Sequence, residues 1–214
     1  MEVFATNISG AESYLTELDA AIGDGDHGVN MCRGMHAVEN RLGDLAIVYP
    51  SGQLRLVSTT LMSAVGGASG PLYGAFFLQS SHAVINMQDL NLNEFTGAME
   101  AGCRGVVQLG KAVVGDKTMV DTLTAAVQSL RVSCSRHEPI WNALEACRET
   151  AHRAALNTVP MIARKGRASY LGPRSAGIQD PGATSAALLF ESMAIAYDSV
   201  FPAAPTQSDR DFLI

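Results

Sequence analysis

Gly23-Asp24-Gly25-Asp26-His27-Gly28 is the most informative stretch of this sequence. Together with Asp19 it places three carboxylates within eight positions, and its glycines allow the backbone to turn tightly. Like charges packed this closely are unfavourable unless a cation lies among them. A hard divalent cation with oxygen ligands fits such a cluster, and Mg²⁺ suits a site that also holds phosphates.

The segment before this loop has the pattern of a helix over residues 11–22. Its apolar residues recur at helical spacing: Tyr14, Leu15, Leu18 and Ile22. Asp19 then lies in the last helical turn, where the negative end of the helix macrodipole disfavours a carboxylate. An acid at that position indicates a compensating metal. An Asp-Gly-Asp surface turn is the simpler interpretation of the loop taken alone. An EF-hand is excluded because Met35 stands where its bidentate glutamate should be.

Length, charge and cysteine spacing restrict the class of protein. The 214 residues suit one domain (1–214) that needs no disulfide to support its core. The formal charge of −6 argues against general affinity for nucleic acid or an anionic membrane surface. There is no Cys-x-x-Cys pair, no signal-peptide pattern and no apolar stretch of membrane-spanning length. We therefore expect a cytoplasmic protein with no nucleic-acid or membrane partner.

Helical periodicity dominates the rest of the chain, and alternating strand patterns are nearly absent. The predicted helices span about 11–22, 29–41, 54–65, 72–87, 93–109, 117–132, 138–159 and 182–199. Short connections make consecutive helices antiparallel, so the fold class is an all-α bundle. We expect a helical core over about 11–199 and a loose tail over 200–214. The segment 160–180 is too rich in glycine and basic residues for a simple helix link.

Two further segments could bind phosphate. Residues 66–70 read Gly-Gly-Ala-Ser-Gly, and their backbone N–H groups could cradle an anion at the start of a helix. A close-packed helix turn explains that segment equally simply. Four of the fifteen basic residues fall within eleven positions: Arg164, Lys165, Arg167 and Arg174. In an acidic protein such a patch suits a bound phosphate, although a solvated basic loop is the alternative.

The remaining features of note are two predicted helix N-caps and the histidines. Asp116 is the predicted N-cap of the helix over 117–132, and Asp180 is the predicted N-cap before Pro181. His27 lies inside the acidic loop. The other histidines have no carboxylate partner at convincing spacing: His36, His82, His137 and His152.

These segments together resemble the nucleotide-binding L subunit (DhaL) of dihydroxyacetone kinase. The resemblance is carried, in order, by the acidic loop (19–31), Gly-Gly-Ala-Ser-Gly-Pro (66–71), Gly-Asp-Lys-Thr-Met (115–119), Ala-Arg-Lys-Gly-Arg (163–167) and Asp-Pro-Gly-Ala-Thr-Ser (180–185). It runs from about Tyr14 to Tyr197. The family fold it implies is a closed barrel of about eight antiparallel helices with the nucleotide site at one end. The family's first helix is expected to be truncated here.

The resemblance also implies a set of site residues. Two Mg²⁺ ions would be held by Asp19, Asp24 and Asp26. ADP or ATP would be contacted by His27, Gly28, Val29, Asn30, Ala68, Ser69, Gly110, Met119, Arg167, Asp180, Pro181 and Gly182. Arg167 would also be the catalytic residue, stabilising charge on the transferred phosphoryl group.

The implied activity is that of a phosphotransferase subunit that works only with partners. Dihydroxyacetone would be bound by a separate K subunit, and a phosphohistidine protein of the phosphotransferase system would recharge ADP to ATP in place. Two alternatives stay open: a related kinase subunit for another ketose such as erythrulose, and a nucleotide-loaded regulatory module. A phosphohydrolase is a third, with His27 as its only evident base.

Overall fold

The computed structural model describes residues 1–43 and 49–202, and every regular element in that part of the chain is a helix. The elements are α1 (Glu2–Gly10), α2 (Glu12–Ile22), α3 (His27–Gly43), α4 (Pro50–Ala64), α5 (Ser69–Ala83), α6 (Leu92–Gly110), α7 (Met119–Ser135), α8 (Ile140–Leu156), the 3₁₀ helix η1 (Arg167–Ser175) and α9 (Pro181–Val200). The all-helical class expected from the sequence is confirmed.

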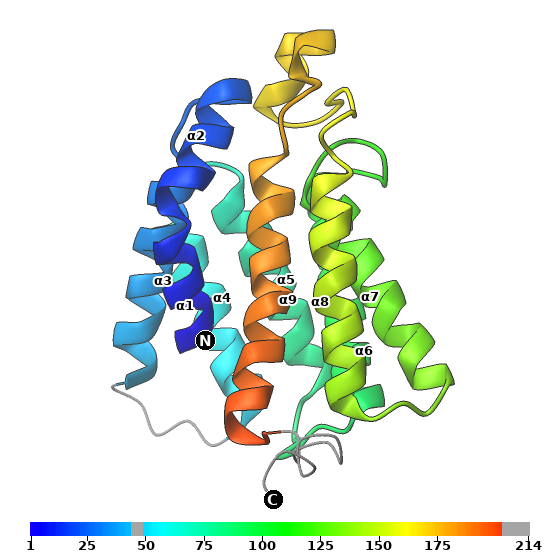
Figure 1. The fold of residues 1–214 in the computed structure, drawn as a ribbon. Helices are drawn as coiled ribbons and strands as arrows, with labels where there is room; N and C mark the ends of the chain where they lie inside the picture. The colour runs from blue at the N-terminus through cyan, green and yellow to red at the C-terminus, as the bar shows by residue number, and fades with distance from the viewer. Residues whose placement is uncertain (44–48, 203–214) are drawn as a thin grey trace, which may run out of the picture.

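The helices pack side by side around a ring, and their axes are roughly parallel or antiparallel to one another (Figure 1). From α3 to α9 each helix contacts the next one in the sequence, and both α1 and α2 contact α3 and α9, so the sequence of contacts closes on itself. The connections that follow α2, α4, α6 and α8 lie at the same end of this ring, which is the upper end in Figure 1. The candidate functional site is built largely from these four connections.

Aromatic side chains from different helices fill the centre of the ring. The rings of Phe4 on α1 and Tyr73 on α5 are 6.3 Å apart, and Phe76 meets Phe77 edge to face at 5.3 Å. All four are almost fully buried in one continuous core. Burial of each such side chain contributes about 1.5–3 kcal/mol to folding. This packing gives the connections at the upper end a rigid base.

A helix that the sequence did not predict precedes residue 11. Helix α1 buries Phe4, Ala5 and Ile8 in the main core and contacts α3 and α9. Asn7 also donates a hydrogen bond of 2.9 Å to Ser192 Oγ on α9. The helical core therefore begins before residue 11, with a packed helix over Glu2–Gly10.

The predicted helices begin within two residues of the predicted positions, except α4 and α5, which begin four and three residues earlier. Helix α4 begins at Pro50 rather than 54, because proline is tolerated at the first helical position. Helix α5 begins at Ser69, inside the glycine-rich segment. Helix α7 is capped by Thr118 instead of Asp116: Thr118 Oγ1 accepts from the Val120 N–H. The prediction of Asp116 as N-cap was wrong, and its carboxylate accepts from the Val113 N–H.

Helix α9 is the last helix that the structure describes. Helix α9 runs to Val200, and the loose tail expected over 200–214 lies, from residue 203 on, outside the described residues. Between residues 1 and 202, with 44–48 left aside, no helix combines the length and the apolar character that a membrane span requires.

Candidate functional site

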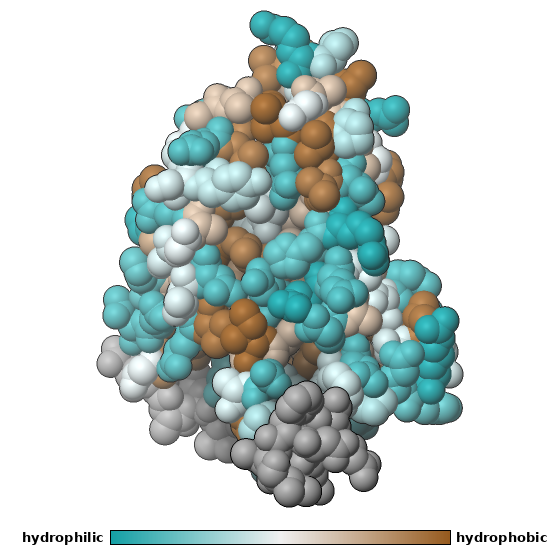
Figure 2. Space-filling view, viewed as in Figure 1, coloured by the Kyte–Doolittle hydropathy of each residue, from teal (hydrophilic) through white to brown (hydrophobic). Residues whose placement is uncertain are grey.

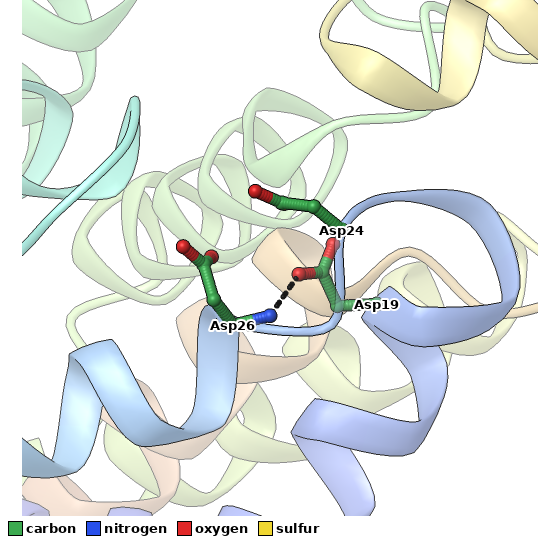
Figure 3. Close-up of side chains that lie close together, drawn as sticks. All are labelled: Asp19, Asp24 and Asp26. Atoms are coloured by element: carbon green, nitrogen blue, oxygen red, sulfur yellow. Dashed lines mark hydrogen bonds between the residues drawn. The ribbon is translucent and has the colours of Figure 1, made fainter.

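Asp19, Asp24 and Asp26 meet at the α2–α3 connection. One carboxylate oxygen from each lies within 4.8 Å of the other two. Figure 3 shows the three side chains pointing to the same side of the loop, with Asp19 coming from the end of α2. Three hard oxygen donors gathered in this way are suited to a divalent cation, and in Mg²⁺ sites the remaining positions go to water and phosphate.

Asp19 is held in place by the start of the next helix. Its Oδ2 accepts the backbone N–H of Asp26 at 2.9 Å and that of His27 at 3.1 Å. These N–H groups belong to the start of α3, where the helix macrodipole favours negative charge. The sequence indicated a metal as the compensation for Asp19, and the structure adds these two N–H groups as a second source of compensation. Gly23 is needed for the arrangement, since a Cβ there would lie 2.1 Å from Asp19 Oδ1.

Arg167, the first residue of η1, contacts the acidic cluster. Its Nη1 lies 2.7 Å from Asp24 Oδ2. The Arg167 side chain is 62% exposed, so the pair contributes at most about 1 kcal/mol to stability. Its effect is to place a permanent positive charge beside the carboxylates, where a phosphate would need it.

A cavity of about 390 Å³ opens beside the acidic cluster, a size within the range of small-molecule sites. Its wall includes the following residues of the predicted set: Asp19, Asp24, Asp26, His27, Ala68, Ser69, Gly110, Met119, Arg167, Asp180, Pro181 and Gly182. The four connections of the upper end thus bring together segments that are far apart in the sequence.

Three residues of the predicted set do not line this cavity: Gly28, Val29 and Asn30. A Cβ on Gly28 would lie 2.1 Å from the Glu12 carbonyl oxygen, so this glycine allows α3 to pack closely on α2. Val29 is exposed, and the buried Asn30 accepts a hydrogen bond of 2.6 Å from Arg33 Nη2. In this structure their positions are those of packing and surface residues.

His27 is buried and joins the cavity to the core through hydroxyl groups. Its Nδ1 lies 3.0 Å from Ser69 Oγ, and its Nε2 lies 2.9 Å from Ser185 Oγ on α9. The Tyr73 hydroxyl lies 2.8 Å from the same Ser185 oxygen. Burial lowers the pKa of His27, although the carboxylates of Asp19 and Asp26 act in the opposite direction. The imidazole is therefore set up as a neutral hydrogen-bonding group.

Lys117 is a residue of the cavity wall that sequence reasoning missed. Its side chain is 0% exposed, and its Nζ donates to the carbonyl oxygens of Thr158 at 2.7 Å and Ile178 at 2.5 Å. It thereby ties the α6–α7 connection to both ends of the 157–180 segment. Burial lowers the pKa of Lys117, whereas the nearby Asp180 carboxylate raises it. Lysine is rarely fully buried, so nothing local in the sequence signals this role.

Asp180 caps α9, as the sequence predicted, and it also faces the cavity. Its Oδ2 accepts the Ala183 N–H at 2.7 Å, and its backbone N–H donates to Thr158 Oγ1 at 2.9 Å. Burial raises the pKa of the Asp180 carboxyl to about 7, while the Ala183 N–H and Lys117 hold it down and Asp121 and Asp19 push it further up. Asp180 therefore titrates near neutral pH in the folded protein.

Other residues of the wall were also missed. Leu72, Val106 and Leu109 form an apolar part of the cavity, next to Gly110. Val106 and Leu109 are three positions apart on α6, so helical periodicity alone could have placed them on one face. Outside the site, His152 was wrongly expected to lack a carboxylate partner: its Nε2 lies 2.9 Å from Glu191 Oε2 on α9.

Comparison with known proteins agrees with this geometry. The family model described as the DAK2 domain matches residues 21–195, from the end of α2 to within α9. The chain belongs to the DAK2 domain family. The match covers all four connections that form the cavity, while α1 lies outside it.

Several named proteins are similar to this chain over most of the length of both. The chain is 45% identical over 195 residues to the protein named PEP-dependent dihydroxyacetone kinase, ADP-binding subunit DhaL, of Escherichia coli (strain K12), covering 91% of each chain. It is 40% identical to the PTS-dependent dihydroxyacetone kinase, ADP-binding subunit DhaL, of Lactococcus lactis subsp. lactis (strain IL1403), over 89% of this chain and 91% of the relative.

A solved structure has the same fold. The dihydroxyacetone kinase of C. freundii, crystallised in complex with AMP-PNP and Mg²⁺, superposes with a TM-score of 0.70 at 27% identity. The match covers 91% of this chain and 32% of that one, so the DAK2 domain described here corresponds to about a third of the larger kinase.

Proposed function

We propose that this protein is the ADP-binding subunit of a dihydroxyacetone kinase. It holds ADP or ATP with two Mg²⁺ ions and passes a phosphoryl group to dihydroxyacetone bound on a separate K subunit. A phosphohistidine protein of the phosphotransferase system recharges the nucleotide in place, in the cytoplasm. The observation that carries the proposal is the cluster of three carboxylates, with Arg167 beside it, at the edge of a cavity of nucleotide size.

The charges in the site support this ligand. Three carboxylates and the roughly three negative charges of ADP would meet four positive charges on two Mg²⁺ ions, and the Arg167 guanidinium beside Asp24 offsets a further negative charge. The oxygens of Asp19, Asp24 and Asp26 are the donors that Mg²⁺ prefers, and they lie close enough to share the ions. When bound, the ions would supply positive charge that neutralises the phosphates during transfer.

The chain's own residues would then position the phosphates and stabilise their charge. Arg167, already held at Asp24, donates to a phosphoryl oxygen during transfer. Ser69, at the start of α5, offers its hydroxyl and the helix N-terminus to the phosphates. The apolar residues Leu72, Val106 and Leu109 give the adenine a non-polar wall, with Gly110 and Met119 beside it.

The surface around the cavity suits a partner protein. Large hydrophobic side chains at the end of α6 and in the α6–α7 and α8–α9 connections are exposed: Leu109, Val113, Val114, Ile162 and Tyr170, the last to 87%. Figure 2 shows hydrophobic residues among hydrophilic ones at this upper end. Such a rim favours a docking surface for the subunit that carries the ketose.

Nucleotide binding by the purified protein tests the proposal. Native mass spectrometry should find ADP and magnesium bound, and calorimetry of the stripped protein should show Mg²⁺-dependent binding of ADP. With ATP and dihydroxyacetone the chain alone should be inactive, and the matching K subunit should restore turnover. Absence of any ADP binding in Mg²⁺ buffer would contradict the proposal, as would rapid turnover by the chain alone.

Replacement of one carboxylate tests whether the cluster affects ADP binding through a bound Mg²⁺ ion or only through its negative charge. Asp24→Asn should weaken ADP binding about 10- to 100-fold in Mg²⁺, because a ligand is lost. With EDTA the same change should leave ADP binding unchanged or tighter, because one repelling charge is gone. Asp89→Asn, at an exposed position between α5 and α6, is the matched control and should change neither value.

A further inference from the structure

A line of hydroxyl groups buried behind the cavity bears on how the site holds its ligand. Tyr73 on α5 and Ser185 on α9 are both fully buried, and neither lines the cavity. Ser185 Oγ lies 2.8 Å from the Tyr73 hydroxyl and 2.9 Å from His27 Nε2. On the other side of the imidazole, His27 Nδ1 lies 3.0 Å from Ser69 Oγ, which does face the cavity.

The donors and acceptors of this line can be assigned from its far end. Ser185 Oγ is the one partner of the Tyr73 hydroxyl among the described residues, and burial raises the pKa of the phenol, so Tyr73 keeps its proton and donates it to Ser185. Ser185 then has one proton of its own. It donates this proton either to His27 Nε2 at 2.9 Å or to the Gly182 carbonyl oxygen at 3.1 Å.

The two choices have opposite consequences at the cavity. If Ser185 donates to Gly182, His27 carries its proton on Nε2. The bare Nδ1 of His27 then accepts a hydrogen bond from the Ser69 hydroxyl. Ser69 then presents only lone pairs to a ligand, which repel an anion. If Ser185 donates to Nε2, His27 carries its proton on Nδ1 and donates it to Ser69. The Ser69 proton is then free to point into the cavity.

We propose that Ser185 and Tyr73 are positioning residues that keep the His27 proton on Nδ1, so that Ser69 donates its hydroxyl proton to a phosphate oxygen of the bound nucleotide. This inference rests on the proposed function, because it needs an anion at Ser69. Each hydroxyl in the line donates toward the cavity, and hydrogen bonds aligned in this way polarise one another. A buried core tyrosine thereby strengthens the contact with the ligand without touching it.

The position of the proton is measured directly by ¹⁵N NMR of the imidazoles, in which protonated and bare ring nitrogens give distinct signals. The five histidines are few enough to assign, with His27 identified by loss of its signals in His27→Asn. In the wild-type complex with ADP and Mg²⁺, His27 should be protonated at Nδ1 and bare at Nε2. A proton on Nε2, or protons on both nitrogens, would overturn the inference.

Two variants test the same line by affinity. Ser185→Ala removes the donor to Nε2 and should weaken ADP binding about 3- to 10-fold, with loss of the single Nδ1–H pattern. Tyr73→Phe removes only the terminal hydroxyl and should weaken binding about 2- to 5-fold. Ser80→Ala is the matched control, since it removes a fully buried hydroxyl of α5 that donates to the carbonyl oxygens of Phe76 and Ala98. It should leave ADP affinity unchanged.

The outcomes separate this inference from the proposed function. Wild-type protein that binds no ADP contradicts the proposed function and the inference with it. Wild-type protein that binds ADP with the proton on Nε2 contradicts the inference alone, as does folded Ser185→Ala protein with wild-type affinity. If Ser185→Ala does not fold, Tyr73→Phe and the wild-type spectrum still decide.

Discussion

Arg167 Nη1 lies 2.7 Å from Asp24 Oδ2, so the 3₁₀ helix of the 157–180 segment is paired with the acidic loop after α2. The pair joins the acidic loop to the basic patch, which are two separate motifs in the sequence. Because both side chains are partly exposed, the contact adds little stability. Its value is that it keeps a guanidinium at the point where a phosphate would meet the carboxylates.

The first prediction concerns the charge of Arg167. Arg167→Ala should lower turnover with the partner subunit about 100- to 1,000-fold, because a donor to the transferred group is lost. The melting temperature should hardly change, because an exposed ion pair contributes only about 0–1 kcal/mol. Arg164→Ala is the matched control: this exposed arginine lies in the same segment but does not line the cavity. Equal turnover of the two variants would show that Arg167 does not take part in the reaction.

A second prediction follows from the space around Gly23. A Cβ at this position would lie 2.1 Å from Asp19 Oδ1, so Gly23→Ala must displace that carboxylate. We expect Mg²⁺-dependent ADP binding to fall at least about 10-fold in calorimetry, because the ligand set is disturbed. Gly97→Ala is the control. It lies on α6 with nothing within 4 Å of the added Cβ, and it should stabilise the helix by about 0.5–1 kcal/mol with unchanged binding.

The helical fold could be predicted from the sequence because apolar periodicity is strong in the long helices. The first helix could not, because α1 offers few signals: it is nine residues long, it has no side-chain N-cap, and it ends in Ser9-Gly10. Its stability comes from burying Phe4 and Ile8 against helices distant in the sequence. Tertiary packing of this kind outweighs local propensity.

The candidate site was predictable where one short segment carries the chemistry. The three carboxylates lie within eight consecutive positions, so their convergence follows from a single turn. Lys117 gains its role only when the α6–α7 connection meets the 157–180 segment, and Ser185 only when α9 lies beside His27 at the start of α3. Similarly, Thr118 and Asp116 are both good capping residues, and only the structure shows that the box formed by Thr118 and Asp121 begins α7.

A third prediction concerns Asp180 and pH. Burial raises the pKa of this carboxyl in the folded protein to about 7, from an ordinary value of 3.8. The folded state therefore keeps a proton that the unfolded state has already lost, so this group lowers the free energy of unfolding as the pH rises from about 4 to 7. Asp180→Asn keeps a capping side chain without the charge, and it should be more stable than the wild type at pH 8, by about 1–4 kcal/mol.

Urea unfolding of the nucleotide-free protein at pH 5 and pH 8 measures this effect. The difference in unfolding free energy between Asp180→Asn and the wild type should grow between the two values. Asp198→Asn, an exposed change on α9, should follow the wild type at both. A constant difference between Asp180→Asn and the wild type would show that Asp180 does not titrate in this range.

The last prediction concerns Lys117, whose ammonium group holds the α6–α7 connection to the carbonyl oxygens of Thr158 and Ile178. Lys117→Met keeps a side chain of similar length but leaves these buried oxygens without their donor. We expect a loss of about 2–5 kcal/mol in urea unfolding, because each unsatisfied buried group costs about 1–3 kcal/mol. Lys165→Met removes an exposed lysine of the same cavity wall and should cost less than about 0.5 kcal/mol. Similar stability of the two variants would mean that the buried ammonium does not hold the site together.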